Sequence, residues 1–389
     1  MFVQRELGAK AKALAEQFPV VSITGPRQSG KSTLVKEVFP DYRYVSLEDE
    51  DMRTLANKDP RSFLSLYDNH VIFDEAQRSP SLFSYLQGVV DATDRPGQFI
   101  LSGSQNFLLM ESITQSLAGR VAVLNLLPFS GDELSRAKLL PARLNEALLN
   151  GGYPRVYSAR INPADYYPSY IQTYLERDVR QGSGILKLSD FERFLGLCAE
   201  RNAELLNKEQ LARDCGIAVK TVESWLSVLE ASFLTLRLQP YYKNYGKRLI
   251  KSPKLCFCDT GLACNLLGLE DASELVTTPY RGAIFESAVV SEVLKAHLNQ
   301  GKKPKLYYWR DTAKIEADLI IEKGTSIAWL IEVKSSATYS PKFFKNLSYL
   351  GDLIGLPTEQ RCVVYAGDQS FETTQGRVVS FGDIHELVS

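Results

Sequence analysis

The residues with the clearest chemical pattern lie near the N-terminus, where an apolar run leads directly into a match to GxxxxGK[ST]. A strand before this motif and a helix after it, expected over Ser32–Phe39, would aim backbone N–H groups at phosphate oxygens. Lys31 would reach the β and γ phosphates of ATP, and Ser32 would hold Mg²⁺. The residues predicted to bind the nucleotide are Gly25, Pro26, Arg27, Gln28, Ser29, Gly30, Lys31, Ser32 and Thr33.

A pair of acids follows the apolar run Val71–Phe73. Asp74 would position the Mg²⁺ ion and its water shell, since hard cations prefer carboxylate oxygens. Glu75 would polarise the attacking water as a general base. The alternative is two exposed acids after a strand, and the phosphate-binding motif favours the functional interpretation.

These groups need a scaffold that brings them to one edge. Strands are expected at Tyr42–Leu47, Val71–Phe73, Gln98–Ser102 and Val121–Leu126, and helices between them include Leu82–Ala92 and Met110–Leu117. Strands that alternate with helices predict a parallel sheet with helices on both faces. Ligands then bind at the carboxyl ends of the strands, where Asp74 and Glu75 stand.

Composition sets the wider limits. A chain of 389 residues is expected to form two to four domains. Its 45 basic and 46 acidic residues give no global charge argument for a nucleic-acid partner. No apolar run reaches the roughly 18–20 residues of a membrane span, and the N-terminus lacks a signal-peptide pattern. We expect a cytoplasmic protein with no membrane segment, and reduced cysteines that are buried rather than metal-bound.

The motifs together resemble the AAA+ ATPases, specifically a prokaryotic group in which the P-loop domain precedes a C-terminal region of uncharacterised function. The segments that carry this resemblance are Gly25–Ser32, Phe73–Gln77, Leu101–Ser104, Leu117–Arg120, Gly151–Pro154, Tyr174–Asp178 and Lys251–Lys254. The resemblance implies an ATP-driven switch or motor that forms a homo-oligomer, often a ring such as a hexamer. It also implies a polar residue that senses the γ phosphate, for which Ser104 is our choice and Ser102 the alternative.

Arg120 is a candidate arginine finger for a neighbouring subunit, because a guanidinium is planar, always charged and bidentate. The alternative is a basic residue that interacts with the dipole at a helix C-terminus. Residues 129–195 have the helical spacing of an AAA+ lid. Arg155 and Arg177 would face phosphate from this lid or else form surface salt bridges.

A helix-turn-helix pattern covers Asn207–Leu226, with a wing over Phe233–Leu238. In DNA-binding proteins the second helix enters the major groove, and Lys220 would face outward there. Glu223 and Glu230 weaken the electrostatic case, so a structural or protein-binding role is the alternative.

The segment from Tyr241 to Lys254 interleaves tyrosines with five basic residues and contains no acid. Bases stack on aromatic rings and cations neutralise phosphates, so this segment predicts nucleic-acid contact, with a solvated loop as the alternative. The DNA-binding candidates are Lys220, Lys243, Lys247, Arg248, Lys251 and Lys254.

The C-terminal part predicts a helix over Ala283–Leu298, three strands, a helix and a further strand, with acids at defined positions. The chemical candidates on these elements are Glu286, Asp318, Glu332 and Lys334. Asp318 and Glu332 would bind a second Mg²⁺, and Lys334 would stabilise charge during phosphodiester attack. This resembles the PD-(D/E)xK restriction-endonuclease-like fold, although Ala317 stands where the family name has proline. The alternative is a sheet crossed by salt bridges.

The prediction is an α/β protein with a P-loop AAA+ core at 1–128, a helical lid at 129–195, a winged helix at 196–245 and a nuclease-like domain at 246–389. We expect Mg²⁺-dependent ATP hydrolysis coupled to single-stranded, duplex or branched DNA, with Mg²⁺-dependent endonuclease cleavage as an open extension. The alternative function is a nucleotide-controlled signalling or protein-partner switch with a catalytically silent nuclease fold.

Overall fold

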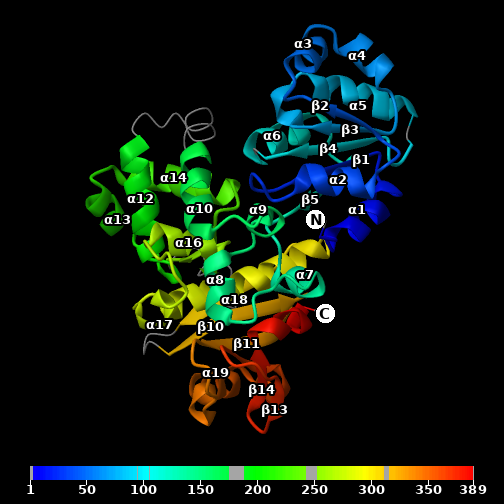
Figure 1. Ribbon diagram of the computed structural model, residues 1–389. Coiled ribbons are helices and arrows are strands. Elements are labelled where there is room, and N and C mark those ends of the chain that lie inside the picture. Colours follow the sequence, from blue (N-terminus) through cyan, green and yellow to red (C-terminus); the bar gives the residue numbers. More distant parts are fainter. Residues whose placement is uncertain are drawn as a thin grey trace. The chain divides into compact units, whose positions relative to one another are not determined.

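The structure is a computed structural model that describes residues 3–93, 95–104, 106–174, 188–241, 252–310 and 315–388. It divides into two compact units (Figure 1). Unit 1 comprises Met1–Phe129, Ala231–Phe233 and Leu298–Lys302. Unit 2 comprises Ser130–Glu230, Leu234–His297 and Lys303–Ser389.

The described strands of unit 1 form a parallel five-stranded sheet with the order β2-β3-β4-β1-β5. The strands are β1 (Val20–Thr24), β2 (Arg43–Ser46), β3 (Val71–Asp74), β4 (Phe99–Gly103) and β5 (Val121–Asn125). These bounds confirm the strands that were expected from the sequence. Because β4 lies between β1 and β3, the residues that follow β1 and β3 flank the end of β4, where Ser102 pairs in register with Asp74.

Helices cover both faces of this sheet, which explains why β1 is buried along its whole length. The helices are α1 (Leu7–Ala15), α2 (Lys31–Val38), α3 (Glu50–Lys58), α4 (Pro60–Leu66), α5 (Leu82–Thr93) and α6 (Asn106–Ser116), with a 3₁₀ turn η1 (Ala76–Arg78). Figure 1 shows α1 and α2 on one side of the sheet and α5 on the other. One core cluster joins Leu7 and Leu34 to Ile100, and a second joins Phe63 and Leu86 to Phe73.

The described strands of unit 2 form a mixed nine-stranded sheet with the order β13-β14-β12-β11-β10-β9-β7-β8-β6. They are β6 (Glu204–Leu205), β7 (Thr235–Pro240), β8 (Lys254–Phe257), β9 (Leu306–Arg310), β10 (Glu316–Lys323), β11 (Ser326–Lys334), β12 (Arg361–Tyr365), β13 (Phe371–Thr373) and β14 (Gly376–Ser380). The expected boundary between residues 245 and 246 separates β7 from β8. In the structure these two strands pair antiparallel, with Thr235 opposite Phe257, and β7 continues the sheet to β9.

The helices of unit 2 are α7 (Gly131–Arg136), α8 (Leu144–Asn150), α9 (Pro154–Ser158), α10 (Pro163–Tyr174), α12 (Leu188–Glu200), α13 (Lys208–Cys215), α14 (Val219–Ala231), α16 (Thr260–Leu266), α17 (Glu274–Thr277), α18 (Arg281–Asn299) and α19 (Lys345–Ile354). Short 3₁₀ turns are η3 (Pro341–Phe344), η4 (Thr358–Gln360) and η5 (Phe381–Val388). The helix expected over Ala283–Leu298 is confirmed as α18.

The segment expected to form an ATPase lid lies almost wholly in unit 2, where α8 and α10 pack against α16. Buried Asp259 accepts hydrogen bonds from the Tyr167 hydroxyl at 2.8 Å and from the Gly152 N–H at 2.7 Å. Gly151 has a φ of 62°, and a Cβ there would lie 2.4 Å from Asp259 Oδ1. The donors that a buried carboxylate needs therefore come from α10 and from the loop after α8, which ties both to α16.

Two helices of unit 2 have the expected helix-turn-helix order. The first, α13, ends at Gly216, whose φ of 70° is a left-handed conformation that glycine adopts easily. The second, α14, buries Val222, Trp225 and Leu226. Lys220 lies exposed at the start of α14.

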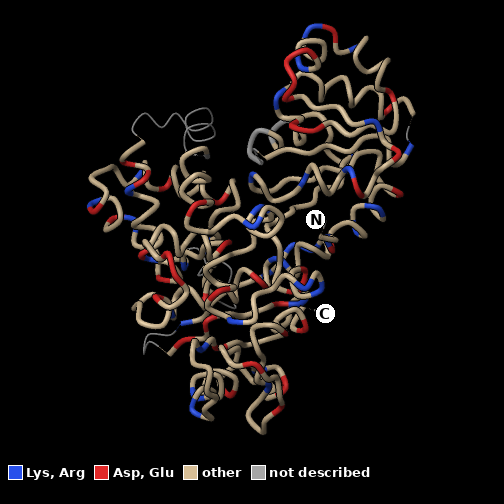
Figure 2. The backbone as a smooth tube through the Cα atoms, viewed as in Figure 1, with Lys and Arg blue, Asp and Glu red and all other residues tan. Residues whose placement is uncertain are grey.

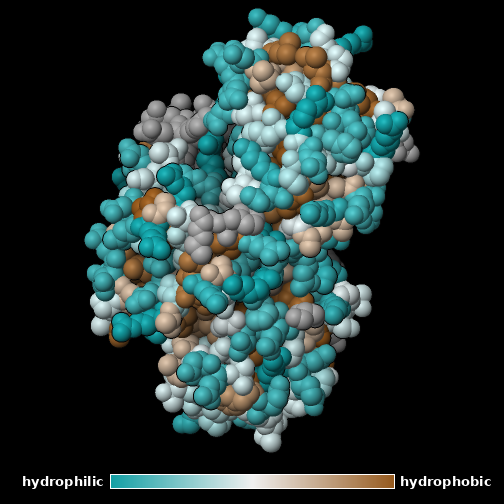
Figure 3. All heavy atoms as spheres, turned by 45° about the vertical axis from the view of Figure 1, so that its right-hand side comes forward, coloured by the Kyte–Doolittle hydropathy of each residue, from teal (hydrophilic) through white to brown (hydrophobic). Residues whose placement is uncertain are grey.

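The surface of the described residues has mixed character. Figure 2 shows Lys and Arg interspersed with Asp and Glu along the chain. On the face drawn in Figure 3, hydrophilic residues surround smaller hydrophobic patches. Among the helices that the structure describes, none is both long enough and apolar enough to cross a bilayer.

Candidate functional site

The phosphate-binding motif forms the loop between β1 and α2 of unit 1. Gly25 must be glycine, because a Cβ there would lie 2.1 Å from the Leu126 carbonyl oxygen. Gly30 has a φ of 95° at the start of α2, which again favours glycine. Lys31 is buried, and its Nζ donates to the carbonyl oxygens of Gly25 at 3.0 Å and Pro26 at 2.7 Å. The loop therefore wraps around the ammonium group that is expected to contact phosphate.

Arg5 braces this loop from the N-terminal segment. It is 6% exposed, and its guanidinium donates to the Ser29 carbonyl oxygen at 2.8 Å and the Leu127 carbonyl oxygen at 2.7 Å. The guanidinium also lies 4.8 Å from the centre of the Phe129 ring. Sequence reasoning missed this residue, because no local pattern links Arg5 to a motif more than twenty residues away.

Asp74 ends β3 and accepts four hydrogen bonds from described residues. Its Oδ2 accepts from Ser32 Oγ at 2.7 Å and from the Tyr44 hydroxyl at 2.5 Å. Its Oδ1 accepts from Ser102 Oγ at 2.5 Å and from the Glu75 N–H at 3.1 Å. Burial favours the neutral acid, but the hydrogen bonds from Ser102, Tyr44 and Ser32 outweigh burial and hold the pKa of Asp74 below its usual value.

The structure thus brings together the two residues that were expected to hold the nucleotide's Mg²⁺. Ser32 and Asp74 present a hydroxyl and an ionised carboxylate, which are the hard oxygen ligands that Mg²⁺ prefers. All the groups bonded to Asp74 are neutral, so its negative charge remains available to a cation. The donor set fits Mg²⁺. Tyr44 is an unexpected member, and its hydroxyl pKa is raised by burial and then by Asp74.

Glu75 has a left-handed backbone with a φ of 53°, which is uncommon for a residue other than glycine. Its Oε2 accepts from Gln77 Nε2 at 2.5 Å and from Ser104 Oγ at 3.4 Å. Ser104, chosen from the sequence as the phosphate sensor, therefore contacts the expected general base. The alternative, Ser102, contacts the expected metal ligand Asp74.

Arg120 lies just before β5, and its guanidinium pairs with Asp91 of α5. Its Nη2 donates to Asp91 Oδ2 at 3.0 Å and its Nη1 to the Ala118 carbonyl oxygen at 3.0 Å. The side chain is one-third exposed. A role as a finger in a neighbouring subunit therefore stays a prediction, and it would require Arg120 to leave Asp91.

The carboxylates of the expected nuclease centre lie close together in unit 2, but they surround a lysine. Lys254 opens β8 and is 4% exposed. Its Nζ lies 2.5 Å from Glu286 Oε1 of α18, 2.5 Å from Glu316 Oε1 of β10 and 3.8 Å from Asp318 Oδ1. Burial alone would lower the pKa of Lys254, but Glu286, Asp318 and Glu316 raise it instead.

This position corrects one DNA-binding candidate. Lys254 was expected to contact DNA phosphates because it belongs to a basic segment, but its ammonium is buried among acids and cannot reach a partner's backbone. Lys220 is exposed, as expected. The remaining basic candidates lie outside the described residues, as does the lid candidate Arg177; they are Lys243, Lys247, Arg248 and Lys251.

The other half of the expected nuclease centre lies on β10 and β11, which are neighbouring strands as expected and pair antiparallel. Asp318 Oδ2 accepts from the Val333 N–H at 2.7 Å, and Lys334 Nζ donates to Glu332 Oε1 at 2.5 Å. Among the described residues, Glu332 Oε2 has no hydrogen-bond partner although it is buried. Burial and then the charge of Asp318 raise the pKa of Glu332 to about 7. Burial and Asp318 also raise the pKa of Glu286, to about 8.

These residues do not fit a divalent metal. The Lys254 ammonium already lies among Glu286, Glu316 and Asp318, at the position that a metal ion between these acids would need. Of the nearby carboxylate oxygens, Glu332 Oε2 is without a hydrogen bond. Within the described ranges, no group of three or more His, Cys, Asp or Glu side chains is placed to hold a metal ion. The two-carboxylate Mg²⁺ site expected at Asp318 and Glu332 is therefore not supported by their surroundings.

Comparisons with known proteins match three successive parts of the chain. Residues 17–135 match a family described as an AAA domain, and residues 141–273 and 281–384 match two domains of unknown function, DUF8612 and DUF4143. Rv2008c of Mycobacterium tuberculosis and Mb2031c of Mycobacterium bovis are each 31% identical over 398 residues, which covers 99% of this chain and 87% of the relative. The chain belongs to the family of these two proteins.

Solved structures give more distant likenesses to this family member. The Walker-type ATPase of Pyrococcus abyssi is 17% identical with a TM-score of 0.46, over 68% of this chain and 96% of that one. RuvB of Thermotoga maritima is 15% identical with a TM-score of 0.33, over 60% of this chain and 88% of that one. The fold of the chain is α/β, and its residues 17–135 match the AAA domain family.

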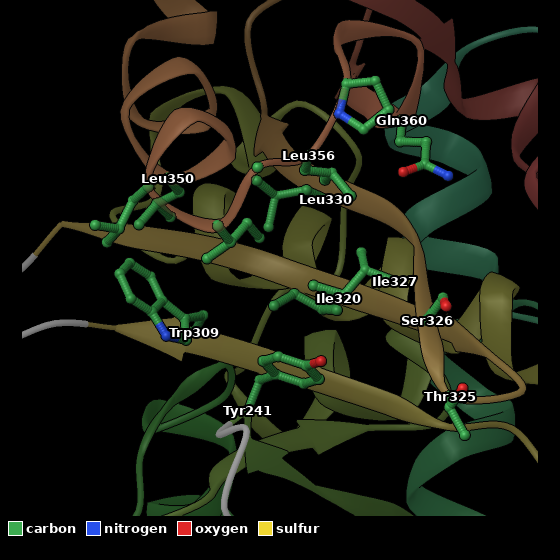
Figure 4. A pocket seen from close by; sticks show the side chains of 14 residues that line it. Tyr241, Trp309, Ile320, Thr325, Ser326, Ile327, Leu330, Leu350, Leu356 and Gln360 are labelled. Atoms are coloured by element: carbon green, nitrogen blue, oxygen red, sulfur yellow. The ribbon is translucent and has the colours of Figure 1, made fainter.

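The cysteines and one pocket of unit 2 offer no further catalytic groups. All six cysteines lie in the described part of the chain and are buried and free, which confirms the expectation of small buried side chains. A pocket of about 690 Å³ lies beside β9, β10, β11 and α19, and Figure 4 shows Trp309 and Tyr241 facing Leu350 and Leu356 across it. Its lining contains no carboxylate, lysine, histidine or cysteine.

Proposed function

We propose that this protein is a Mg²⁺-dependent ATPase whose nucleotide state controls a DNA-directed unit 2. The observation that carries the ATPase assignment is the contact between Ser32 and Asp74, which joins the phosphate-binding motif to the acid at the end of β3 at 2.7 Å. A chance match to a phosphate-binding motif would not bring this carboxylate, ionised and bonded to neutral donors, to Ser32 in the first turn of α2.

The chain's own residues supply the remaining functions. Lys31 and the loop N–H groups would hold the phosphates, and Ser32 and Asp74 would hold Mg²⁺, which neutralises charge on the transferred phosphoryl group. Glu75 would orient and deprotonate the attacking water, with Gln77 and Ser104 fixing its carboxylate. Arg120 would complete the site of a neighbouring subunit in a homo-oligomer, such as a ring.

The proposed DNA partner is supported by the two helices α13 and α14. Lys220 and Ser224 are exposed on α14. Glu223, which weakened the electrostatic case, is engaged by Lys208 Nζ at 3.0 Å and by Arg237 Nη1 at 2.7 Å. Because internal cations neutralise this acid, the surface of α14 repels phosphate less than its sequence implies.

A second candidate function is a nucleotide-controlled switch that acts on a protein partner, with unit 2 as a catalytically silent scaffold. Lys254 favours this candidate, because it fills the acidic cluster that a nuclease would need for metal. We include no cleavage step in either candidate.

Steady-state ATP hydrolysis with and without single-stranded, duplex and branched DNA tests the proposal. We expect one DNA form to stimulate turnover, and Lys220→Glu to weaken that stimulation while leaving the basal rate unchanged. Lys31→Ala should abolish nucleotide binding and serves as the control for contaminating activity. Robust hydrolysis that ignores every DNA would favour the protein-partner switch, and hydrolysis that survives Lys31→Ala would remove the ATPase assignment.

A further inference from the structure

The cluster around Lys254 joins three elements of unit 2 through buried charge. The lysine comes from β8, Glu286 from α18, and Glu316 and Asp318 from β10. Lys254 Nζ also lies 5.6 Å from the centre of the Tyr308 ring, so an aromatic face and carboxylates surround the ammonium group.

The contacts make this lysine the central cation of the cluster. Two carboxylate oxygens lie 2.5 Å from Nζ and a third lies 3.8 Å away. Three partly buried acids without a cation would repel each other in a medium of reduced dielectric constant. The arrangement offers an ammonium ion what a hard metal ion needs, namely carboxylates that converge from separate elements.

We propose that Lys254 is a built-in cation that takes the place of a divalent metal in this acidic cluster, so that unit 2 folds and acts without metal there. The inference concerns unit 2 alone and does not depend on ATP hydrolysis by unit 1.

The neighbouring groups agree with this role. Asp318 Oδ2 is held by the Val333 N–H, and Glu332 Oε1 by Lys334. The remaining buried oxygen, Glu332 Oε2, has no hydrogen-bond partner among the described residues. Lys254 and Lys334 therefore already place two cations against these carboxylates without any added ion.

The first experiment asks whether the full-length chain binds metal at this cluster. Asp74→Asn removes the carboxylate expected to hold metal at the nucleotide site, and Mn²⁺ binding to this background is measured by electron paramagnetic resonance. We expect no Mn²⁺ site that depends on unit 2, so adding Asp318→Asn should leave the titration unchanged. A site that Asp318→Asn or Glu332→Gln removes would overturn the proposal.

The second experiment removes the cation. Lys254→Met, in the same Asp74→Asn background, keeps most of the apolar stem but leaves the carboxylates without their ammonium. We expect Mn²⁺ to bind at least about tenfold more tightly than in the background, and to raise the Tm by about 5–10 °C at 100 times the Kd. The background itself should show no such shift.

A matched control is Lys295→Met, which removes another buried lysine of unit 2. Lys295 is 5% exposed and donates to Glu292 at 2.8 Å, but it lies outside the acidic cluster. We expect this variant to lose stability without gaining Mn²⁺ affinity. A folded Lys254→Met variant that gains no Mn²⁺ affinity would overturn the proposal, and if that variant does not fold, the first experiment decides.

Discussion

The hydroxyl of Tyr44 gives the sharpest test of the proposed Mg²⁺ site. It donates to Asp74 Oδ2 at 2.5 Å, and Ser32 donates to the same oxygen at 2.7 Å. Asp74 is 5% exposed, so water cannot readily replace a lost donor. Tyr44→Phe therefore removes one of two hydrogen bonds from the oxygen that lies nearest the phosphate loop.

The expected size follows from the charge on the acceptor. A hydrogen bond to a charged group is worth about 1.5–3 kcal/mol, which corresponds to roughly a 10- to 150-fold change in an equilibrium constant. Loss of a group that orients a metal ligand commonly weakens metal affinity by about 10- to 100-fold. We expect the free Mg²⁺ concentration that gives half-maximal ATP hydrolysis to rise by about 10- to 100-fold, while nucleotide binding in EDTA stays unchanged.

The assay measures initial hydrolysis rates against free Mg²⁺ at saturating ATP. Tyr42→Phe is the matched control, because the Tyr42 hydroxyl donates to the Gly97 carbonyl oxygen at 2.6 Å rather than to Asp74. It should leave the Mg²⁺ requirement unchanged. If Tyr44→Phe shifts that requirement by less than about twofold, Tyr44 does not orient Asp74 and the reasoning is wrong.

Four further variants test neighbouring parts of the two sites. Ser102→Ala removes a donor to Asp74 and should raise the Mg²⁺ requirement about tenfold, whereas Ser104→Ala should lower kcat without that shift; the reverse pattern would exchange their roles. Glu75→Gln should bind ATP normally in a fluorescence titration but turn it over about 10²- to 10⁴-fold more slowly, and normal turnover would reassign the base. Burial keeps Glu332 protonated in the folded chain up to a pKa of about 7, whereas the unfolded chain releases this proton near pH 4.5. Stability should therefore fall by up to about 3 kcal/mol as the pH rises across that interval, and Glu332→Gln should flatten the profile in urea unfolding; an unchanged slope would contradict the shifted pKa.

The ATPase unit was predictable because its signals are local. A phosphate-binding loop combines glycines at positive φ with a lysine at the start of a helix. The motif that contains Gly30 and Lys31 spans only eight consecutive residues, so it can be recognised in the sequence. Asp74 was equally visible, since an apolar run before an acid marks the end of a buried strand. Tyr44 and Arg5 were missed because their roles arise from contacts across the sheet and across the loop, which leave no trace in nearby sequence.

Lys254 was misread for a related reason. Its neighbours in sequence are basic, and composition placed it on a cationic surface. Its neighbours in space are acidic, because β8 pairs with β7 in the same sheet that carries β10, and α18 also contributes an acid. A sequence pattern predicts the surroundings of a side chain only where local periodicity determines whether that side chain is buried. The contacts of Lys254 with acids on other elements depend on tertiary packing, which the neighbouring sequence does not show.

The acidic centre around Asp74 and the acidic cluster around Lys254 therefore differ in how their negative charge is balanced. This difference indicates which of the two can bind a divalent metal ion. Asp74 is bonded by hydroxyls and a backbone N–H, all neutral, so its charge is stabilised but not cancelled. In unit 2, Lys254 and Lys334 lie directly against the acids, and Arg310 Nη1 lies 3.6 Å from Glu316 Oε2. A divalent ion would gain a full carboxylate charge at the first centre but would have to approach fixed cations at the second. We therefore propose that Mg²⁺ acts with ATP in unit 1, whereas the acidic cluster of unit 2 is balanced by its own lysines.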